Sequence, residues 1–293
     1  MKISTATRNI SSSENLSDAI KLISEAGFDC LDISLFDLTE SNNIFLQNNF
    51  KTYAEKLRKC ADDNGVFFNQ AHAPYSMDMR KYLAGGQLAE NIVFLISRSI
   101  EVAAAVGAEK IVVHPIQCMD YRNANHREIL EVNKEYYGRF AKIAIKNNIK
   151  IAIENMWRKN MYNGQIGQSV CSNPHELALY VDELNGLYGC FGACLDLGHC
   201  TLTGVDPANA ITVLDKRLIA LHVHDNDFVS DMHCLPLSQK IDYAPIMDAL
   251  KKINYQGEFT LEANSFFGNV PTTLLPDALT FAAKVSRDLT KDI

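Results

Sequence analysis

Six ionisable residues recur at nearly regular intervals along the 293-residue chain, each at the end of a short β-rich segment. The intervals between them are 42, 40, 42, 26 and 40 residues, each long enough for one strand, one loop and one helix. Such a repeat predicts parallel strands joined through helices, with the six side chains at the same end of the sheet. The six residues are His72, His114, Glu154, Asp196, His222 and Glu262.

Eight short β-rich segments alternate with longer amphipathic segments. The segment from Leu88 to Val106 illustrates the second kind, since its apolar residues recur every three to four positions, as on one face of a helix. Glycines stand where helices have to end before the next strand, as at Gly27, Gly65 and Gly107. The predicted strands are 2–6, 29–34, 66–72, 109–114, 149–154, 190–196, 218–224 and 257–262.

This alternation predicts an α/β fold, a (β/α)8 TIM barrel, as a single domain over residues 1–293. No linker rich in glycine, serine or proline interrupts the series. A doubly wound open sheet is the alternative. That fold would need a glycine-rich phosphate-binding turn after the first strand, and residues 5–9 (TATRN) do not form one.

Alternation of side chains along the strands predicts where the polar residues point. In the fifth strand, Ile151 and Ile153 face one way, whereas Ala152 and Glu154 face the other. The bulky apolar face has to pack under the helices, so the polar residue points into the barrel at its C-terminal mouth, where active sites of this fold lie. The same alternation applies to Asp196, His222 and Glu262.

The set of three histidines and three carboxylates at one barrel mouth predicts a metal site. Burying several carboxylates without a counter-charge costs several kcal/mol each, and a bound divalent cation offsets that cost. Further candidate ligands follow the strand ends in sequence, namely His199 after Asp196, and Asp231 and His233 after the seventh strand.

Five ordered motifs together resemble the xylose-isomerase-like TIM barrels, which include sugar (phosphate) isomerases and epimerases and the endonuclease IV repair enzymes. The motifs are 71–75 (AHAPY), 153–156 (IENM), 195–199 (LDLGH), 221–226 (LHVHDN) with Asp231-x-His233, and 261–262 (LE). One departure is visible. Many relatives have a Gly-Glu-Gly turn in the seventh loop, where this chain has residues 237–240 (LSQK).

The resemblance implies roles for these residues. In the epimerase branch, one divalent ion, often Mn²⁺, is held by the residues that match Glu154, Asp196, His222 and Glu262. The two glutamates are also the acid and base catalysts, and the residue that matches His199 contacts the substrate. In the endonuclease branch, three zinc ions use these four residues together with His72, His114, His199, Asp231 and His233. All nine are present in this chain.

The predicted function is a divalent-metal-dependent isomerase or epimerase of a ketose or sugar phosphate, by proton transfer next to the carbonyl. Mn²⁺ or Zn²⁺ is the expected ion, and Mg²⁺ or Co²⁺ also suits the ligands. We expect His72, His199 and Trp157 to bind the substrate. The alternatives are an endonuclease IV-like abasic-site nuclease, an inosose-dehydratase-like lyase, and a metal-binding barrel without turnover.

Residues of two kinds are expected near the mouth. Six aromatic residues offer walls for a sugar: Phe36, Tyr75, Trp157, Tyr162, Phe266 and Phe267. Seven basic residues offer charge for one phosphate: Arg80, Lys81, Arg122, Arg127, Arg158, Lys159 and Lys240. The net charge of −7 and the acids after the second strand, Asp37 and Glu40, argue against nucleic acid as the main partner.

Composition places the chain among cytoplasmic globular proteins. Hydrophobic residues make up 47% and charged residues 22%, which suffices for a full core. No apolar run approaches the roughly 20 residues of a membrane span, and residues 1–6 are too short and polar for a signal peptide. Eight scattered cysteines without a C-x-x-C pair fit a reducing cytosol. Homo-oligomers are frequent in the families that the chain resembles, although no interface can be identified from the sequence.

Overall fold

The computed structural model describes residues 1–11, 14–160 and 163–293. A parallel eight-stranded sheet forms its centre, and each strand lies within two residues of the predicted bounds. The strands are β1 (Ile3–Ala6), β2 (Cys30–Ser34), β3 (Phe67–His72), β4 (Lys110–Val113), β5 (Lys150–Glu154), β8 (Phe191–Asp196), β9 (Leu218–His222) and β10 (Phe259–Leu261).

The sheet closes on itself to form a barrel. Its order is β10-β1-β2-β3-β4-β5-β8-β9, so the last strand pairs with the first. The remaining seam between β9 and β10 is joined by a bridge of Val223 to Leu261, with a 2.9 Å hydrogen bond from Val223 N to the Thr260 carbonyl. The predicted (β/α)8 barrel is therefore confirmed, and the open-sheet alternative is wrong.

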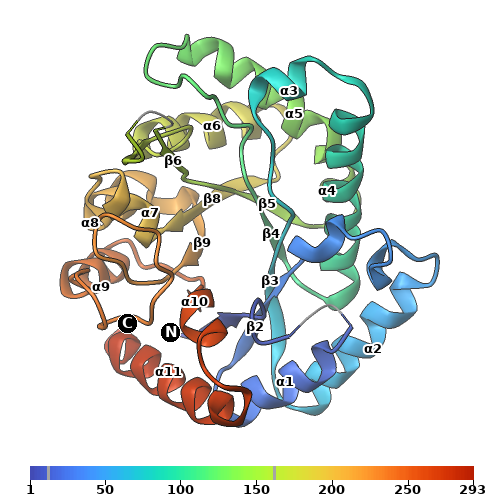
Figure 1. Cartoon of the computed structure of the whole chain (residues 1–293), viewed down its shortest axis with the longest axis vertical. Coiled ribbons are helices and arrows are strands. Elements are labelled where there is room, and N and C mark those ends of the chain that lie inside the picture. The colour runs from blue at the N-terminus through green and yellow to red at the C-terminus, as the bar shows by residue number, and fades with distance from the viewer. Residues whose placement is uncertain (12–13, 161–162) are drawn as a thin grey trace.

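Helices surround the strands (Figure 1). The long helices are α1 (Leu16–Glu25), α2 (Phe50–Asp63), α4 (Gly86–Val106), α5 (His126–Lys146), α6 (Pro174–Leu187), α8 (Pro207–Leu214), α9 (Ala244–Lys252) and α11 (Leu275–Thr290). Gly107 ends α4 in the left-handed conformation, with φ of 88°, as the sequence predicts. Short 3₁₀ turns are 36–39, 44–46, 215–217 and 272–274.

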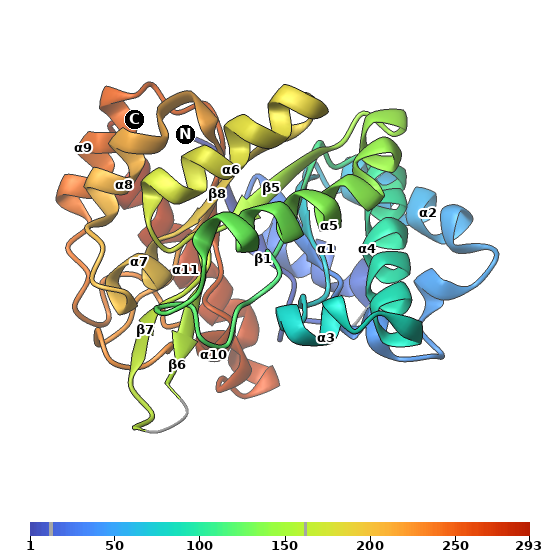
Figure 2. The same cartoon turned by 90° about the horizontal axis from the view of Figure 1, so that it is seen from above.

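Short elements gather at one end of the barrel, on the side away from the two termini (Figure 2). They are α3 (Met79–Leu83), α7 (Leu197–Leu202), α10 (Asn264–Gly268) and the antiparallel hairpin of β6 (Trp157–Lys159) and β7 (Ile166–Gln168). All of them follow the carboxyl ends of strands, so they form the rim of the mouth where the polar residues were predicted.

The barrel interior is lined with small residues, as side-chain alternation predicts. Val112, Ala152, Cys194 and Ala220 form a buried cluster of their own. The residues of opposite parity, such as Ile151, belong to the large core between strands and helices. This separation places Glu154 and its equivalents above an apolar layer inside the barrel.

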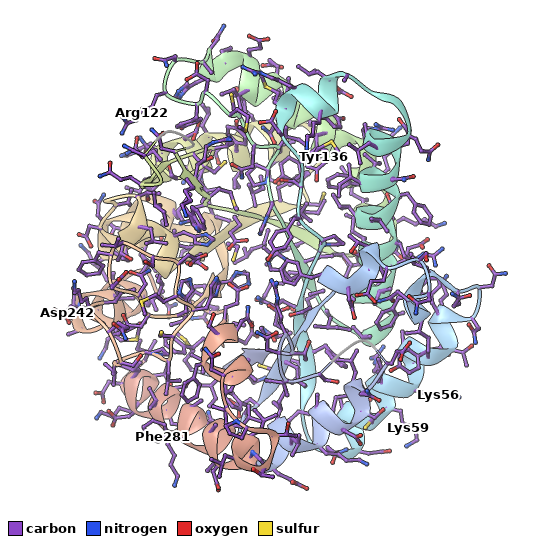
Figure 3. The ribbon with its side chains drawn as sticks, viewed as in Figure 1. Lys56, Lys59, Arg122, Tyr136, Asp242 and Phe281 are labelled. Carbon is purple, nitrogen blue, oxygen red and sulfur yellow. The ribbon has the colours of Figure 1, made fainter. Side chains whose placement is uncertain are left out.

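The outer layer separates buried and exposed side chains in the usual way. Tyr136 of α5 is fully buried, whereas Lys56, Lys59 and Phe281 lie at the periphery in Figure 3. All eight cysteines are free thiols. Within the described ranges, no helix combines the length and the hydrophobicity that a membrane span requires.

Candidate metal centre and active site

Four side chains from four strands converge at the mouth of the barrel. Glu154, Asp196 and His222 end β5, β8 and β9, and Glu262 directly follows β10. Their potential ligand atoms all lie within 4.8 Å of one another. His222 Nδ1 lies 3.1 Å from Glu154 Oε1 and 3.4 Å from Glu262 Oε2. The structure thus brings together the four residues that the sequence predicts as principal metal ligands.

His72 and His114 form a second group with Glu154. Their Nε2 atoms lie 3.4 Å and 2.8 Å from Glu154 Oε2, and all three side chains are buried. The Nδ1 atom of His72 lies 2.8 Å from the Ala73 carbonyl oxygen, so it carries the proton that this bond needs. The Nε2 atom of His72 therefore faces the carboxylate.

His199, Asp231 and His233 form a third group beside the first two. His199 lies in the first turn of α7, whose N-terminus is capped by the Asp196 carboxylate through a 2.7 Å bond to the His199 amide. Asp231 Oδ2 lies 3.2 Å from His233 Nε2 and 3.9 Å from His199 Nε2. Trp157 Nε1 donates a 3.1 Å hydrogen bond to the same oxygen. All nine predicted ligands are thus in one continuous site.

Two buried polar residues that sequence reasoning missed support His222 from below. Asp32 Oδ2 lies 3.4 Å from His222 Nε2 and accepts a 2.9 Å hydrogen bond from Gln70 Nε2. An outer partner of this kind fixes the tautomer and orientation of a metal-binding imidazole. Asp32 and Gln70 lie within strands rather than at their ends, so the spacing of strand-end residues did not reveal them.

Asn155 and His224 were also missed. Asn155 clamps Asp196, since its side chain donates to the Asp196 carbonyl at 3.0 Å and accepts from the Asp196 amide at 2.7 Å. Its own carbonyl lies 2.8 Å from His199 Nδ1. His224 Nε2 lies 3.1 Å from Asp196 Oδ1. His224 comes two residues after His222, so the alternation along the strand could have found it.

Burial and charge act against each other on the ionisable groups of the site. Burial alone would raise the pKa of Glu154, but the charges of His222 and His114 hold it well below its usual range. Burial likewise opposes protonation of His233, yet Glu262 and Asp231 raise the pKa of His233 to about 10. Protonated histidines therefore compensate the carboxylates when no cation is bound.

The donor set fits a divalent cation. Asp196 is fully buried, and its Oδ2 atom finds no hydrogen-bond donor among the described residues. An unpaired buried oxygen is costly, and a bound cation would satisfy it. Carboxylates with one or two imidazoles suit Mn²⁺, Mg²⁺, Co²⁺ or Zn²⁺.

A cavity of about 570 Å³ opens above this centre. Phe36, Tyr75 and Trp157 line its walls, as predicted. Two other predictions were wrong, because Phe267 is buried in the core and Phe266 packs against that core. Tyr162 lies outside the described residues.

The basic residues of this cavity only partly match the prediction. Arg158 and Lys159 line it, together with Arg8, which was not predicted. Arg127 instead pairs with Glu131 along α5 at 2.8 Å. The other predicted cations do not belong to the described lining: Arg80, Lys81, Arg122 and Lys240.

A larger hollow of about 770 Å³ lies at the opposite end of the barrel, away from the metal-binding groups.

The loop after β9 is held in an unusual backbone conformation. His233 has φ of 44° and Leu237 has φ of 69°, a left-handed region that residues with a side chain rarely adopt. The Asp225 carboxylate fixes this loop by accepting hydrogen bonds from the amides of Gln239 and Ile241, at 2.9 Å and 3.0 Å. This contact holds the loop that presents His233 to the site.

Comparisons with known proteins agree with this architecture. A family model described as a xylose isomerase-like TIM barrel matches residues 20–281. Uncharacterised protein MJ1311 of Methanocaldococcus jannaschii is 27% identical over 252 residues, which cover 85% of this chain and 79% of that protein.

Two solved structures share the fold over the full length. A D-tagatose 3-epimerase-like protein superposes with a TM-score of 0.75 at 22% identity, covering 100% of this chain and 98% of the other. An IolI protein with a bound zinc atom superposes with a TM-score of 0.74 at 16% identity, covering 100% and 99%.

Proposed function

Because the chain belongs to the xylose isomerase-like TIM barrel family, we propose that it is a divalent-metal-dependent isomerase or epimerase of a ketose or ketose phosphate. Glu154 and Glu262 would exchange a proton with the carbon next to the carbonyl. The D-tagatose 3-epimerase-like protein that shares the fold supports the choice of substrate class.

One observation carries the proposal. Two glutamates from strands on different sides of the barrel, Glu154 and Glu262, meet in a single group with Asp196 and His222. Both glutamates also line the cavity, whose volume of about 570 Å³ and aromatic walls suit a sugar. A carbon acid needs such a pair, because one carboxylate removes the proton and the other returns it.

The residues divide the chemical work between them. Glu154, Asp196, His222 and Glu262 would hold a divalent ion, and the Lewis acidity of that ion would polarise the carbonyl and acidify the adjacent C–H. Return of the proton to the same carbon by the opposite glutamate gives an epimer. Return of the proton to the former carbonyl carbon instead gives an isomer.

Further residues would orient the sugar. We assign His72, His199 and Trp157 to substrate binding, since all three line the cavity. Imidazoles can donate to or accept from sugar hydroxyls at neutral pH, and His199 can do so where no metal ion occupies its Nε2. The indole ring of Trp157 offers an apolar face beside the centre.

Hydrolysis of a phosphodiester at an abasic site is the second candidate function. It is favoured by the two additional groups, one of His72 and His114 with Glu154, and the other around His199, Asp231 and His233. The net charge of −7 opposes the approach of a polyanionic duplex.

Product analysis separates the two functions. The native protein, loaded with Mn²⁺ or with Zn²⁺, is incubated with a panel of ketoses and ketose phosphates and with a duplex that contains one abasic site. Conversion of a ketose that EDTA abolishes supports the proposal. EDTA-sensitive nicking of the duplex without any sugar conversion overturns it in favour of the nuclease, and formation of a dehydrated product indicates the lyase.

A further inference from the structure

His224 is a fully buried histidine whose ring is poorly satisfied. Neither ring nitrogen makes a hydrogen bond to the described part of the chain. Its Nε2 atom lies 3.1 Å from Asp196 Oδ1 and 3.7 Å from Asp231 Oδ1, an oxygen that also lacks a hydrogen bond there. Buried polar atoms are normally paired, so two unpaired atoms that face each other indicate a missing ligand.

We propose that His224 is the fourth protein ligand at the third group, where the resemblance to endonuclease IV already implies an ion on His199, Asp231 and His233; this group with His224 is called the second metal site below. The potential ligand atoms of these four residues lie within 4.8 Å of one another. The Nε2 atoms of the three histidines lie close to the oxygens of the Asp231 carboxylate, at 3.2 Å for His233, 3.7 Å for His224 and 3.9 Å for His199. An ion with tetrahedral bonds of about 2.0–2.1 Å separates its ligands by roughly 3.3 Å, so small side-chain shifts suffice.

Two of the other ligands are already oriented as a metal needs. His199 Nδ1 lies 2.8 Å from the Asn155 carbonyl oxygen, and His233 Nδ1 lies 2.8 Å from the Glu262 carbonyl oxygen. Each Nδ1 therefore keeps its proton, and Nε2, which faces the group, is the nitrogen whose proton a metal would displace. Hydrogen bonds of this kind are typical of metal-binding histidines.

Gly198 provides the space in which the His224 ring lies. A Cβ atom at position 198 would lie 2.0 Å from His224 Cε1 and 2.4 Å from Nε2, far inside van der Waals contact. The ring also stacks on His233, with centroids 4.1 Å apart and planes inclined by 19°. The glycine of the Leu195–His199 motif is therefore explained by the position of His224.

The fourth ligand changes what the second ion can do. A site with three protein ligands leaves a position open for water or substrate, whereas four protein ligands close a tetrahedral site. The second ion would then act as a fixed positive charge beside Asp196, and reaction would be confined to the first centre.

Trp157 gives a direct optical signal for the second site. It is the single tryptophan of the chain, its Nε1 donates to Asp231 at 3.1 Å, and its ring centroid lies 6.3 Å from that of His199. Full-length protein is stripped with chelator and titrated with Zn²⁺, while tryptophan fluorescence and bound metal per chain are measured. Asp231→Asn serves as the reference variant, because it removes the carboxylate that contacts both the group and Trp157.

His224→Ala should lose one metal ion per chain. The Zn²⁺ affinity obtained from the fluorescence titration should fall by about 100-fold or more, since loss of even an outer partner of a ligand lowers metal affinity 10–100-fold. The double variant with Asp231→Asn should lose no more metal than either single variant. Co²⁺ substitution should show the absorption of a tetrahedral ion in the native protein and lose it in His224→Ala.

Gly198→Ala tests the same claim without removing a ligand. It should displace the His224 ring and cause the same loss of metal. Gly186→Ala is the matched control, because a Cβ there meets nothing within 4 Å and the residue lies in α6. Circular dichroism of each variant checks that the barrel is folded.

Two results would overturn the proposal. One is a folded His224→Ala protein with native metal content and an unchanged fluorescence titration. The other is loss of a metal ion with the Trp157 response intact, which would mean that His224 only orients Asp196 at the first centre.

Discussion

Glu154 Oε1 lies 3.1 Å from His222 Nδ1 in a region where neither side chain is more than 1% exposed. The two residues are 68 positions apart in the chain and end different strands, β5 and β9. A carboxylate and an imidazole held this closely without solvent form either a charged pair or two ligands of one cation.

Glu154→Gln and Glu262→Gln should each reduce turnover of the ketose substrate by several orders of magnitude. Removal of a general acid or base costs about 10²–10⁴, and loss of a metal ligand adds to it. Steady-state rates with saturating Mn²⁺ measure the effect. Glu55→Gln, on the exposed surface of α2, is the control with the same change of charge. A rate near that of the native protein in either active-site variant would contradict the assignment.

Asp196→Asn should lower the metal content and the melting temperature of the loaded protein together. Asparagine preserves the N-cap of α7 that Asp196 provides, so the loss reports the charge rather than the helix end. Each kcal/mol of lost stability lowers Tm by about 2–4 °C in a chain of this size. The difference between variant and native protein should shrink in EDTA. Unchanged metal content after dialysis would show that Asp196 is not a ligand.

Asp32→Asn should weaken metal binding about 10–100-fold without removing a ligand, because Asp32 supports His222 through its far nitrogen. Competition with a chelating dye measures the affinity of the folded variant. Asp18→Asn, on the exposed part of α1, is a suitable control. Equal affinities in the two variants would mean that the contact between Asp32 and His222 is only structural.

Metal-free protein should lose stability as pH rises from about 6.5 to about 10. Although burial opposes it, the charges of Glu262 and Asp231 raise the pKa of His233 from 6.5 to about 10 in the folded state. A pKa that is higher in the folded than in the unfolded protein stabilises the folded state. This stabilisation is fully present at a pH below the pKa of the unfolded protein and is lost as the pH rises through the pKa of the folded protein.

Bound cations should flatten this dependence, since they hold the histidines deprotonated. Melting curves at several pH values, with EDTA or with Mn²⁺, provide the measurement. The gain in Tm on adding metal should therefore increase with pH. Parallel curves with and without metal would argue that His233 and its neighbours are not ligands.

Most of the barrel could be predicted because strand and helix periods alternate without interruption. The hairpin β6–β7 was not predicted, since its strands have three residues each and carry no apolar pattern. It nevertheless brings Trp157 to Asp231, a contact that depends on the path of a loop.

The residues at strand ends were also predictable, because a parallel barrel places the carboxyl ends of its strands together irrespective of loop conformation. Glu154 and Asp196 are examples. Asp32 gave no signal, since one polar residue inside a strand looks like any other partly buried position. The burial of Phe267 depends on how α10 folds back onto the core, which local sequence does not determine.

Exchange of solvent deuterium into a ketose tests the central claim most directly. Native protein loaded with Mn²⁺ should introduce deuterium at the carbon next to the carbonyl of at least one ketose or ketose phosphate, followed by NMR. EDTA, Glu154→Gln and Glu262→Gln should each abolish the exchange. Absence of exchange across the panel, together with metal-dependent nicking of an abasic-site duplex by the same preparation, would contradict it.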